Sequence, residues 1–138
     1  MRQHGFSLVE LMIAVMIVGI LAGFAVPSYL ESTRKANRVN AKKAVLEAVA
    51  RQETYRAQTL GYGRDMINLG YSTNPYITPD GLYSVAVTSA LPATGRATSF
   101  TITATALGEQ VKDSCDGFSM DNIGNKSVSE NSPNGDCW

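Results

Sequence analysis

The chain has 138 residues, enough for one small domain and an appendage. Its 12 basic and 12 acidic side chains cancel, and its charged fraction of 17% lies below the roughly 25% of average globular proteins. This composition excludes a histone-like polycation and a disordered acidic tail. A single histidine, His4, and two cysteines leave little room for histidine-based catalysis or a Cys/His metal cluster.

The first predicted element is an apolar segment without any charge from Leu11 to Val26. With the apolar residues just before it, the segment reaches the roughly 20 residues that cross a hydrocarbon core. The residues alone leave open a cleaved secretory signal, a plain membrane anchor and a span with a functional carboxylate. Glu10 disfavours the cleaved signal, and no cation lies between Arg2 and Arg34 to pair with it. Its carboxylate therefore snorkels to the headgroups or finds a partner on a chain end or another chain.

The sequence from Gly5, GFSLVELMIAVMIVGILA, resembles the class III signal of type IV pilins. That signal is a short basic leader ending in glycine, then phenylalanine, a glutamate and an apolar helix. The resemblance implies cleavage between Gly5 and Phe6 by prepilin peptidase and N-methylation of Phe6. It also implies that Glu10 pairs with the Phe6 amine of a neighbouring subunit during assembly. Gly19 and Pro27 are expected to bend the helix.

The same resemblance divides the chain into a leader at residues 1–5, a transmembrane and assembly helix at 6–30 and a globular pilin head at 31–138. It implies a single-pass protein of the bacterial inner membrane with a periplasmic head, which later enters a cell-surface pilus. The implied partners are other pilin subunits, prepilin peptidase and the inner-membrane pilus assembly machinery. Counting positive charges alone favours the opposite topology, because Arg34 and Lys35 follow the span.

A second helical stretch is predicted from residue 28 to about residue 58, where no glycine or proline interrupts the pattern. Its apolar residues at helical spacing are expected to pack on a sheet: Ala36, Val39, Val45, Leu46, Ala48, Val49 and Tyr55. Seven basic and three acidic side chains give residues 31–56 a net charge of +4. We expect the basic side chains to face away from the sheet, toward solvent, an acidic neighbour or DNA phosphates.

Glycines and prolines predict a loop over residues 59–81, with a short helical turn at 65–69. Apolar and polar residues then alternate, or apolar residues recur, in four stretches: 83–88, 100–106, 117–120 and 126–128. The last of these is the weakest. These elements predict an α+β fold in which an antiparallel meander of three or four strands packs on one helix.

Cys115 and Cys137 are the only cysteines, and in an oxidising compartment they are expected to form a disulfide. The bond would close a loop of about 23 residues, which the chain-entropy model values at roughly 3.4 kcal/mol. The two cysteines do not form a Cys-x-x-Cys motif, which disfavours a redox function. The enclosed region resembles the C-terminal disulfide loop of the type IV pilin fold.

Three stretches of the head carry a closer resemblance: CDGFSMDNIGNK from Cys115, DCW from Asp136, and the loop that starts GYG at Gly61. They resemble the PilE-type minor pilins and the related ComP-type DNA-uptake pilins. The leading hypothesis is a structural, non-enzymatic subunit of a type IV pilus. It would be a minor pilin that contributes to pilus assembly or initiation, in twitching motility, adhesion or DNA uptake. No catalytic motif, cofactor-binding loop or metal-ligand spacing is evident.

Two alternatives remain open, a DNA-binding competence pilin and a type II secretion pseudopilin. The DNA-binding alternative requires a basic surface on the head, yet residues 57–138 have a net charge of −4. Four cations are the candidates for contacts with DNA or a partner: Arg64, Arg96, Lys112 and Lys126. Any DNA binding is expected to be weak and strongly salt-sensitive.

The role of Glu10 can be tested by substitution. Glu10→Ala is predicted to be inserted and cleaved normally, because a costly charge is removed and the Gly5–Phe6 junction is intact. It is predicted to enter fibres poorly, because the Phe6 amine loses its partner. A bulky residue at Gly5 would instead stop processing and leave a heavier membrane precursor. Immunoblots of membrane and sheared-fibre fractions measure both effects, and normal recovery of Glu10→Ala in fibres would exclude the charge pair.

Overall fold

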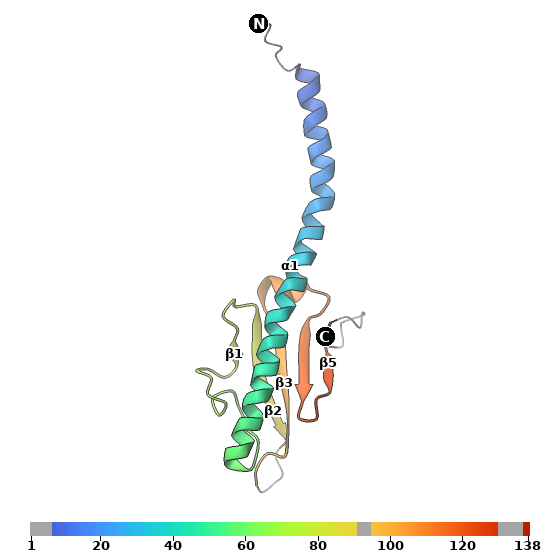
Figure 1. The fold of residues 1–138 in the computed structure, drawn as a ribbon. Helices are drawn as coiled ribbons and strands as arrows, with labels where there is room; N and C mark the ends of the chain where they lie inside the picture. The colour runs from blue at the N-terminus through green and yellow to red at the C-terminus, as the bar shows by residue number, and fades with distance from the viewer. Residues whose placement is uncertain (1–6, 91–94, 130–136) are drawn as a thin grey trace. The chain divides into compact units, whose positions relative to one another are not determined.

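The computed structural model describes residues 7–90, 95–129 and 137–138 (Figure 1). Within them the chain forms α1 (Leu8–Thr59), β1 (Tyr76–Ile77), β2 (Tyr83–Ala90), β3 (Ser99–Ala106), the 3-10 helix η1 (Gly108–Lys112), β4 (Gly117–Asp121) and β5 (Lys126–Val128). The chain divides into two compact units, Met1–Thr33 and Arg34–Trp138. We call the second unit the head.

The N-terminal unit contains the first part of α1, whose apolar side chains are exposed. This segment is long and apolar enough to cross a membrane. The hydroxyl of Ser7 accepts a hydrogen bond from the Glu10 backbone N–H at 3.2 Å, which caps the start of the helix. The helix continues through Gly19 and Pro27, and a bend at these positions stays a prediction. The processing site after residue 5 lies outside the described residues.

In the head, the buried face of α1 differs from the predicted apolar stripe. Ala36 is exposed, and Val39 and Leu46 keep 62% and 46% of their surface accessible, so the prediction was wrong for these three. The other members are buried or half-buried as expected: Val45, Ala48, Val49 and Tyr55. The helix residues that are buried are Arg38, Ala41, Ala44, Val45, Ala48 and Gln52. Two of these are polar, so a search for apolar spacing placed part of the stripe on the wrong face.

The five strands form one antiparallel meander in the order β1-β2-β3-β4-β5. Three fully buried side chains stand in one row across it, because Val85 pairs with Ala104 and Ala104 pairs with Phe118. α1 runs along this sheet (Figure 1). The α+β prediction is confirmed, but the described sheet has five strands where three or four were expected. The additional strand, β1, is only two residues long, too short to show an alternating pattern.

A buried ion pair joins α1 to Asp113, the residue that follows η1. The Nε of Arg38 donates to Oδ2 of Asp113 at 2.7 Å, and both side chains are buried. Gln110, which is also buried, donates to the same oxygen at 3.3 Å and to the Arg34 carbonyl at 3.0 Å. The prediction that basic side chains face away from the sheet is therefore wrong for Arg38. The charge is tolerated inside because several hydrogen bonds accompany the pair.

The disulfide between Cys115 and Cys137 is present, with a Cα–Cα distance of 5.7 Å and both residues buried. Trp138 then packs edge-on against Phe118, with ring centroids 5.7 Å apart. Its indole N–H donates to the carbonyl of Ser127 on β5 at 2.7 Å. These contacts hold residues 137 and 138 against the last two strands.

α1 ends at a residue in the left-handed conformation, Leu60, with φ of 62°. Its N–H donates to the Arg56 carbonyl at 2.8 Å, the single bond of an αL helix end. Glycine normally occupies this position, because a side chain there costs about 1–2 kcal/mol. Leu60 remains 76% exposed, so little burial in the head offsets that cost.

Breaking the buried ion pair is predicted to destabilise the head. Arg38→Met leaves the Asp113 carboxylate buried without its cation and is expected to lower the free energy of unfolding by about 3–5 kcal/mol. The double variant with Asp113→Leu removes both charges and is expected to recover most of that loss. Thermal unfolding of the full-length protein in nonionic detergent, followed by circular dichroism, measures both. Equal stability of Arg38→Met and the parent would contradict the prediction.

Leu60→Gly is predicted to stabilise the protein. The substitution relieves the left-handed strain of about 1–2 kcal/mol but adds chain entropy worth about 0.5–1 kcal/mol. The expected net gain in the free energy of unfolding is about 0.5–1 kcal/mol. Leu60→Ala keeps the strain and serves as the control in the same thermal unfolding experiment. A lower melting temperature for Leu60→Gly would show that the leucine side chain stabilises the fold.

Candidate nucleic-acid interface

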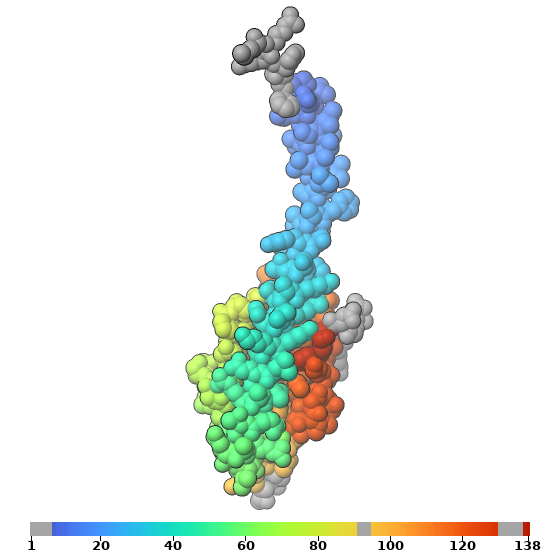
Figure 2. Space-filling model, viewed as in Figure 1, coloured from blue at the N-terminus to red at the C-terminus, as the bar shows by residue number. Residues whose placement is uncertain are grey.

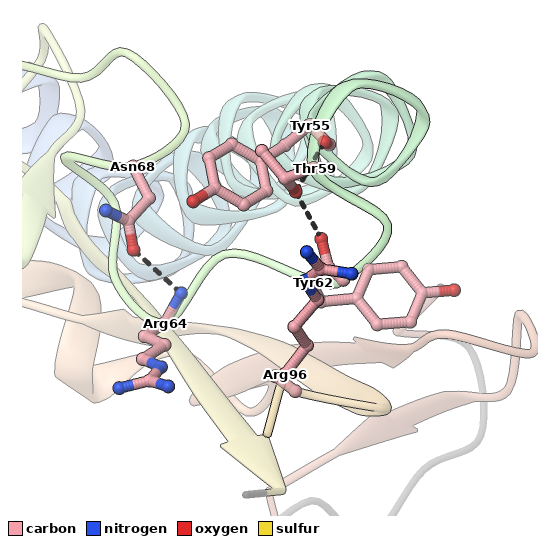
Figure 3. A pocket seen from close by; sticks show the side chains of 8 residues that line it. Tyr55, Thr59, Tyr62, Arg64, Asn68 and Arg96 are labelled. Carbon is pink, nitrogen blue, oxygen red and sulfur yellow. Dashed lines mark hydrogen bonds between the residues drawn. The ribbon is translucent and has the colours of Figure 1, made fainter.

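A pocket of about 290 Å³ lies where α1 ends and the following loop meets the residues before β3 (Figure 3). Six polar or aromatic side chains line it: Tyr55, Thr59, Tyr62, Arg64, Asn68 and Arg96. They come from the end of α1, from the loop that directly follows it, and from the segment before β3, which is distant in sequence. The tertiary structure, rather than a local motif, therefore assembles the pocket.

Gln52 connects the loop to α1. Its side chain is fully buried, and it makes two hydrogen bonds with the backbone of Gly63. The amide N–H₂ donates to the Gly63 carbonyl at 3.0 Å, while the amide oxygen accepts from the Gly63 N–H at 2.8 Å. Ser89 on β2 donates to the same carbonyl at 2.8 Å. The backbone immediately before Arg64 is therefore attached to both the helix and the sheet.

The loop beyond Gly63 is held by its own hydrogen bonds. The Arg64 N–H donates to Oδ1 of Asn68 at 2.9 Å, and the Asn68 N–H donates to Oδ1 of Asp65 at 2.8 Å. A hydrogen-bonded turn follows, with the Gly70 N–H bound to the Ile67 carbonyl at 2.9 Å. The short helical turn expected at residues 65–69 is thus a turn without helix, because side chains take the bonds that a helix would use.

Two contacts bring the Gly61 region against the segment that precedes β3. The Tyr62 N–H donates to the Ala97 carbonyl at 3.1 Å, in an isolated β-bridge. A Cβ on Gly61 would lie only 2.5 Å from the Cβ of Arg96, so only glycine fits there. Figure 3 shows the Arg96 side chain crossing the loop at this point. Gly61 therefore allows Arg96 to approach the end of α1 closely.

Arg64 and Arg96 are exposed, and within the described residues neither forms an ion pair with a carboxylate. Arg64 donates only a long hydrogen bond of 3.4 Å to the Gly95 carbonyl. By contrast, Arg51 pairs with Glu47 at 2.8 Å. The pocket thus has two guanidinium groups available to an anion, and guanidinium binds phosphate oxygens in a bidentate manner.

Other cations of the head lie over aromatic rings: Arg51 over Tyr71 at 4.3 Å, Arg56 over Tyr62 at 5.0 Å, Lys42 over Phe118 at 5.8 Å and Lys126 over Trp138 at 5.0 Å. Arg56 also donates to the Tyr62 hydroxyl at 2.7 Å. Burial, reinforced by the Glu47 carboxylate, raises the pKa of Tyr71 to about 12, so its phenol stays neutral. The basic face expected along α1 is therefore partly engaged with the head's own rings.

The four predicted contact residues are only partly brought together. Arg64 and Arg96 line the same pocket, as the DNA-binding alternative required. Lys112 pairs with Glu109 at 2.7 Å in η1, which follows the opposite end of β3 from Arg96. An eight-residue strand measures about 26 Å, so Lys112 lies far from this pocket. Lys126 lies on the edge strand β5.

Sequence reasoning missed Tyr55, Thr59 and Asn68 as members of the pocket. The first two look like ordinary helix residues, and only the loop's return to the helix end gives them a shared site. Among the residues that the structure describes, no group of three His, Cys, Asp or Glu side chains could hold a metal ion. The chemistry that this arrangement supports is recognition of an anion, with polar and aromatic groups beside it.

Comparisons with known proteins show two family patterns that match this chain. The pattern of the prokaryotic N-terminal methylation motif matches residues 1–26. The pattern described as "Type IV minor pilin ComP, DNA uptake sequence receptor" matches residues 27–119, more than half of the chain. The first match covers the apolar N-terminal segment and the second covers most of the head. Prepilin peptidase processing and pilus assembly are implied by the first match.

Individual relatives are similar over shorter stretches. The type IV major pilin protein PilE1 of Neisseria gonorrhoeae is 39% identical over 62 residues, 45% of this chain and 36% of that protein. The type II secretion system core protein G of Dickeya chrysanthemi is 28% identical over 78 residues, 56% of this chain and 51% of that protein. The chain thus spans about a third to a half of the length of these curated relatives.

A type IV pilin structure from Shewanella oneidensis has a similar fold, with a TM-score of 0.52 and 19% identity over 76% of this chain and 97% of that one. This likeness confirms the long helix packed on an antiparallel sheet. The N-terminal apolar helix is typical of pilins that are anchored in the inner membrane and assembled into pili. The chain is a non-enzymatic, type IV pilin-like subunit that belongs to the family of the type IV minor pilin ComP, the DNA uptake sequence receptor.

Proposed function

We propose that this protein is a DNA-binding minor pilin that serves in DNA uptake. The observation that carries the proposal is the pair of guanidinium groups, Arg64 and Arg96, which share one pocket of the head and form no ion pair with a carboxylate among the described residues. The family that covers residues 27–119 is described as a DNA uptake sequence receptor, which supports the same function. This function ranks above a general role in pilus assembly or initiation, which the N-terminal motif alone favours.

The local charge explains how an overall neutral protein attracts DNA. Residues 57–138 have a net charge of −4, so the head as a whole does not attract phosphates strongly. Arg64 and Arg96 concentrate positive charge beside Asn68 and the two pocket tyrosines. Phosphate contacts then position the duplex, while the neighbouring polar and aromatic groups are available to bases or sugars. Binding that rests on few phosphate contacts is weak for one subunit and sensitive to salt.

The N-terminal segment supports a pilus location for this activity. We propose that prepilin peptidase cleaves after Gly5, that Phe6 is methylated, and that Glu10 pairs with the Phe6 amine of a neighbouring subunit. Before assembly the protein would span the inner membrane once, with its head in the periplasm and its disulfide formed there. After assembly with other pilins by the inner-membrane machinery, the head would be displayed on the cell surface, where DNA is accessible.

Substitution of the two arginines tests the proposal. In the full-length protein in nonionic detergent, Arg64→Gln and Arg96→Gln are each expected to weaken binding of a labelled 20-base-pair duplex. Each removed phosphate contact is expected to reduce the slope of log affinity against log salt by about 0.9. Fluorescence anisotropy between 50 and 200 mM salt, the range in which such contacts change affinity by orders of magnitude, measures both quantities.

Lys112→Gln is the matched control, because Lys112 is exposed but lies at the opposite end of β3. It is expected to leave the affinity and the salt slope nearly unchanged. Equal losses from Lys112→Gln and Arg64→Gln would show diffuse attraction rather than a site. Unchanged binding in the double arginine variant would contradict the proposed function, as would an absence of DNA binding by the parent protein.

A further inference from the structure

We propose that Leu60 inserts its side chain between the base steps of the DNA that Arg64 and Arg96 hold. The inference rests on the proposed function and deepens it, because it assigns an apolar contact with bases to the same end of the head. It makes Leu60 a residue that distinguishes DNA sequences by how easily their base pairs unstack.

The backbone at Leu60 is the first observation. The residue has φ of 62°, in the left-handed region where glycine is favoured, and its N–H forms the αL bond to Arg56. Leucine is strained there, and its side chain is 76% exposed, so packing within the head explains little of its presence. A strained residue that points into solvent suggests a partner that lies outside the chain.

The position of Leu60 beside the pocket is the second observation. The next residue, Gly61, approaches Arg96 so closely that no side chain fits between them. Leu60 itself borders a hollow that is also lined by Glu53, Arg56 and Ala57 of the last helical turns, where Arg56 lies 3.8 Å from the Glu53 carboxylate. These turns lie on the surface of the head (Figure 2). An exposed apolar side chain thus stands one residue before the loop that carries Arg64, next to the glycine that Arg96 approaches.

Charge identifies the partner as DNA. The partner must present anions to Arg64 and Arg96 and an apolar surface to Leu60 within a short distance. A duplex does so, because its phosphates flank stacked bases. Leucine is among the side chains that enter DNA as wedges between base steps, and arginines commonly accompany them. The cost of such entry is lower at pyrimidine–purine steps such as TA than in stiff A-tracts.

The experiment compares two 20-base-pair duplexes of equal composition, one with alternating TA steps and one with an A-tract. The full-length protein in nonionic detergent is tested as parent, Leu60→Gly and Leu60→Ala, with Val111→Ala as control. Val111 is an apolar residue of η1 that is 52% exposed, at the other end of β3. Fluorescence anisotropy gives the affinities and the salt slopes, and thermal unfolding gives the stability.

Leu60→Gly and Leu60→Ala are expected to weaken binding to the TA duplex about tenfold, as the loss of one buried leucine contact predicts. The affinity for the A-tract duplex is expected to change much less. The salt slope stays constant, because no phosphate contact is lost. The melting temperature of Leu60→Gly is equal to or above that of the parent, so unfolding does not explain the loss. Val111→Ala leaves all of these quantities unchanged.

The inference is overturned if Leu60→Gly keeps the parent's preference for the TA duplex. If the arginine variants then still show a lower affinity and a smaller salt slope, the proposed function is retained and only the insertion of Leu60 is rejected. An absence of DNA binding by the parent overturns both. Loss of Leu60→Gly from sheared fibres, with unchanged DNA binding, would assign Leu60 to contact with a neighbouring subunit and would also overturn the inference.

Discussion

The attachment of Gly63 to the buried amide of Gln52 organises the end of the head. A fully buried glutamine is stable only when its polar atoms are paired, and both hydrogen bonds here go to one backbone unit. This holds the loop against α1 at the point where it turns back toward β3. Arg64 follows directly in sequence, and Arg96 reaches the same place across Gly61. Together with the bridge between Tyr62 and Ala97, this attachment holds the two arginines at one pocket.

At the other end of the head, the buried polar side chains are also paired by hydrogen bonds. Arg38 on α1 is paired with Asp113, and Gln110 completes the hydrogen bonds of that carboxylate. Together with Gln52, Arg38 makes the buried face of the helix polar at both ends and apolar in the middle. Each of these polar groups needs one particular hydrogen-bonding partner, whereas a hydrophobic contact can form with many neighbours. The two groups therefore set how far along the sheet the helix lies, while Val45 and its apolar neighbours supply the burial.

The end of α1 departs from the packing that stabilises the rest of the head. Most of the head obeys ordinary packing, with the row from Val85 to Phe118 fully buried and the disulfide closing the C-terminal region. Leu60 departs from that pattern, since a strained backbone carries an exposed apolar side chain. Its position directly before the loop that carries Arg64 fits the binding surface proposed for this end of the head. Strain of this kind persists where the surrounding structure holds the residue in place.

The sequence alone determined the features that depend on local pattern. Periodicity and composition were sufficient to predict the apolar N-terminal segment with Glu10, the alternating strands and the cysteine pair. Each of these features can be recognised from neighbouring residues or from a residue type that occurs only twice. Only the tertiary structure decided which cations share a site. Arg64 and Arg96 are 32 positions apart, and Lys112 and Lys126 have the same chemistry, so charge could not distinguish them. The buried face of α1 was also decided in three dimensions, because Arg38 becomes a core residue only when Asp113 is beside it.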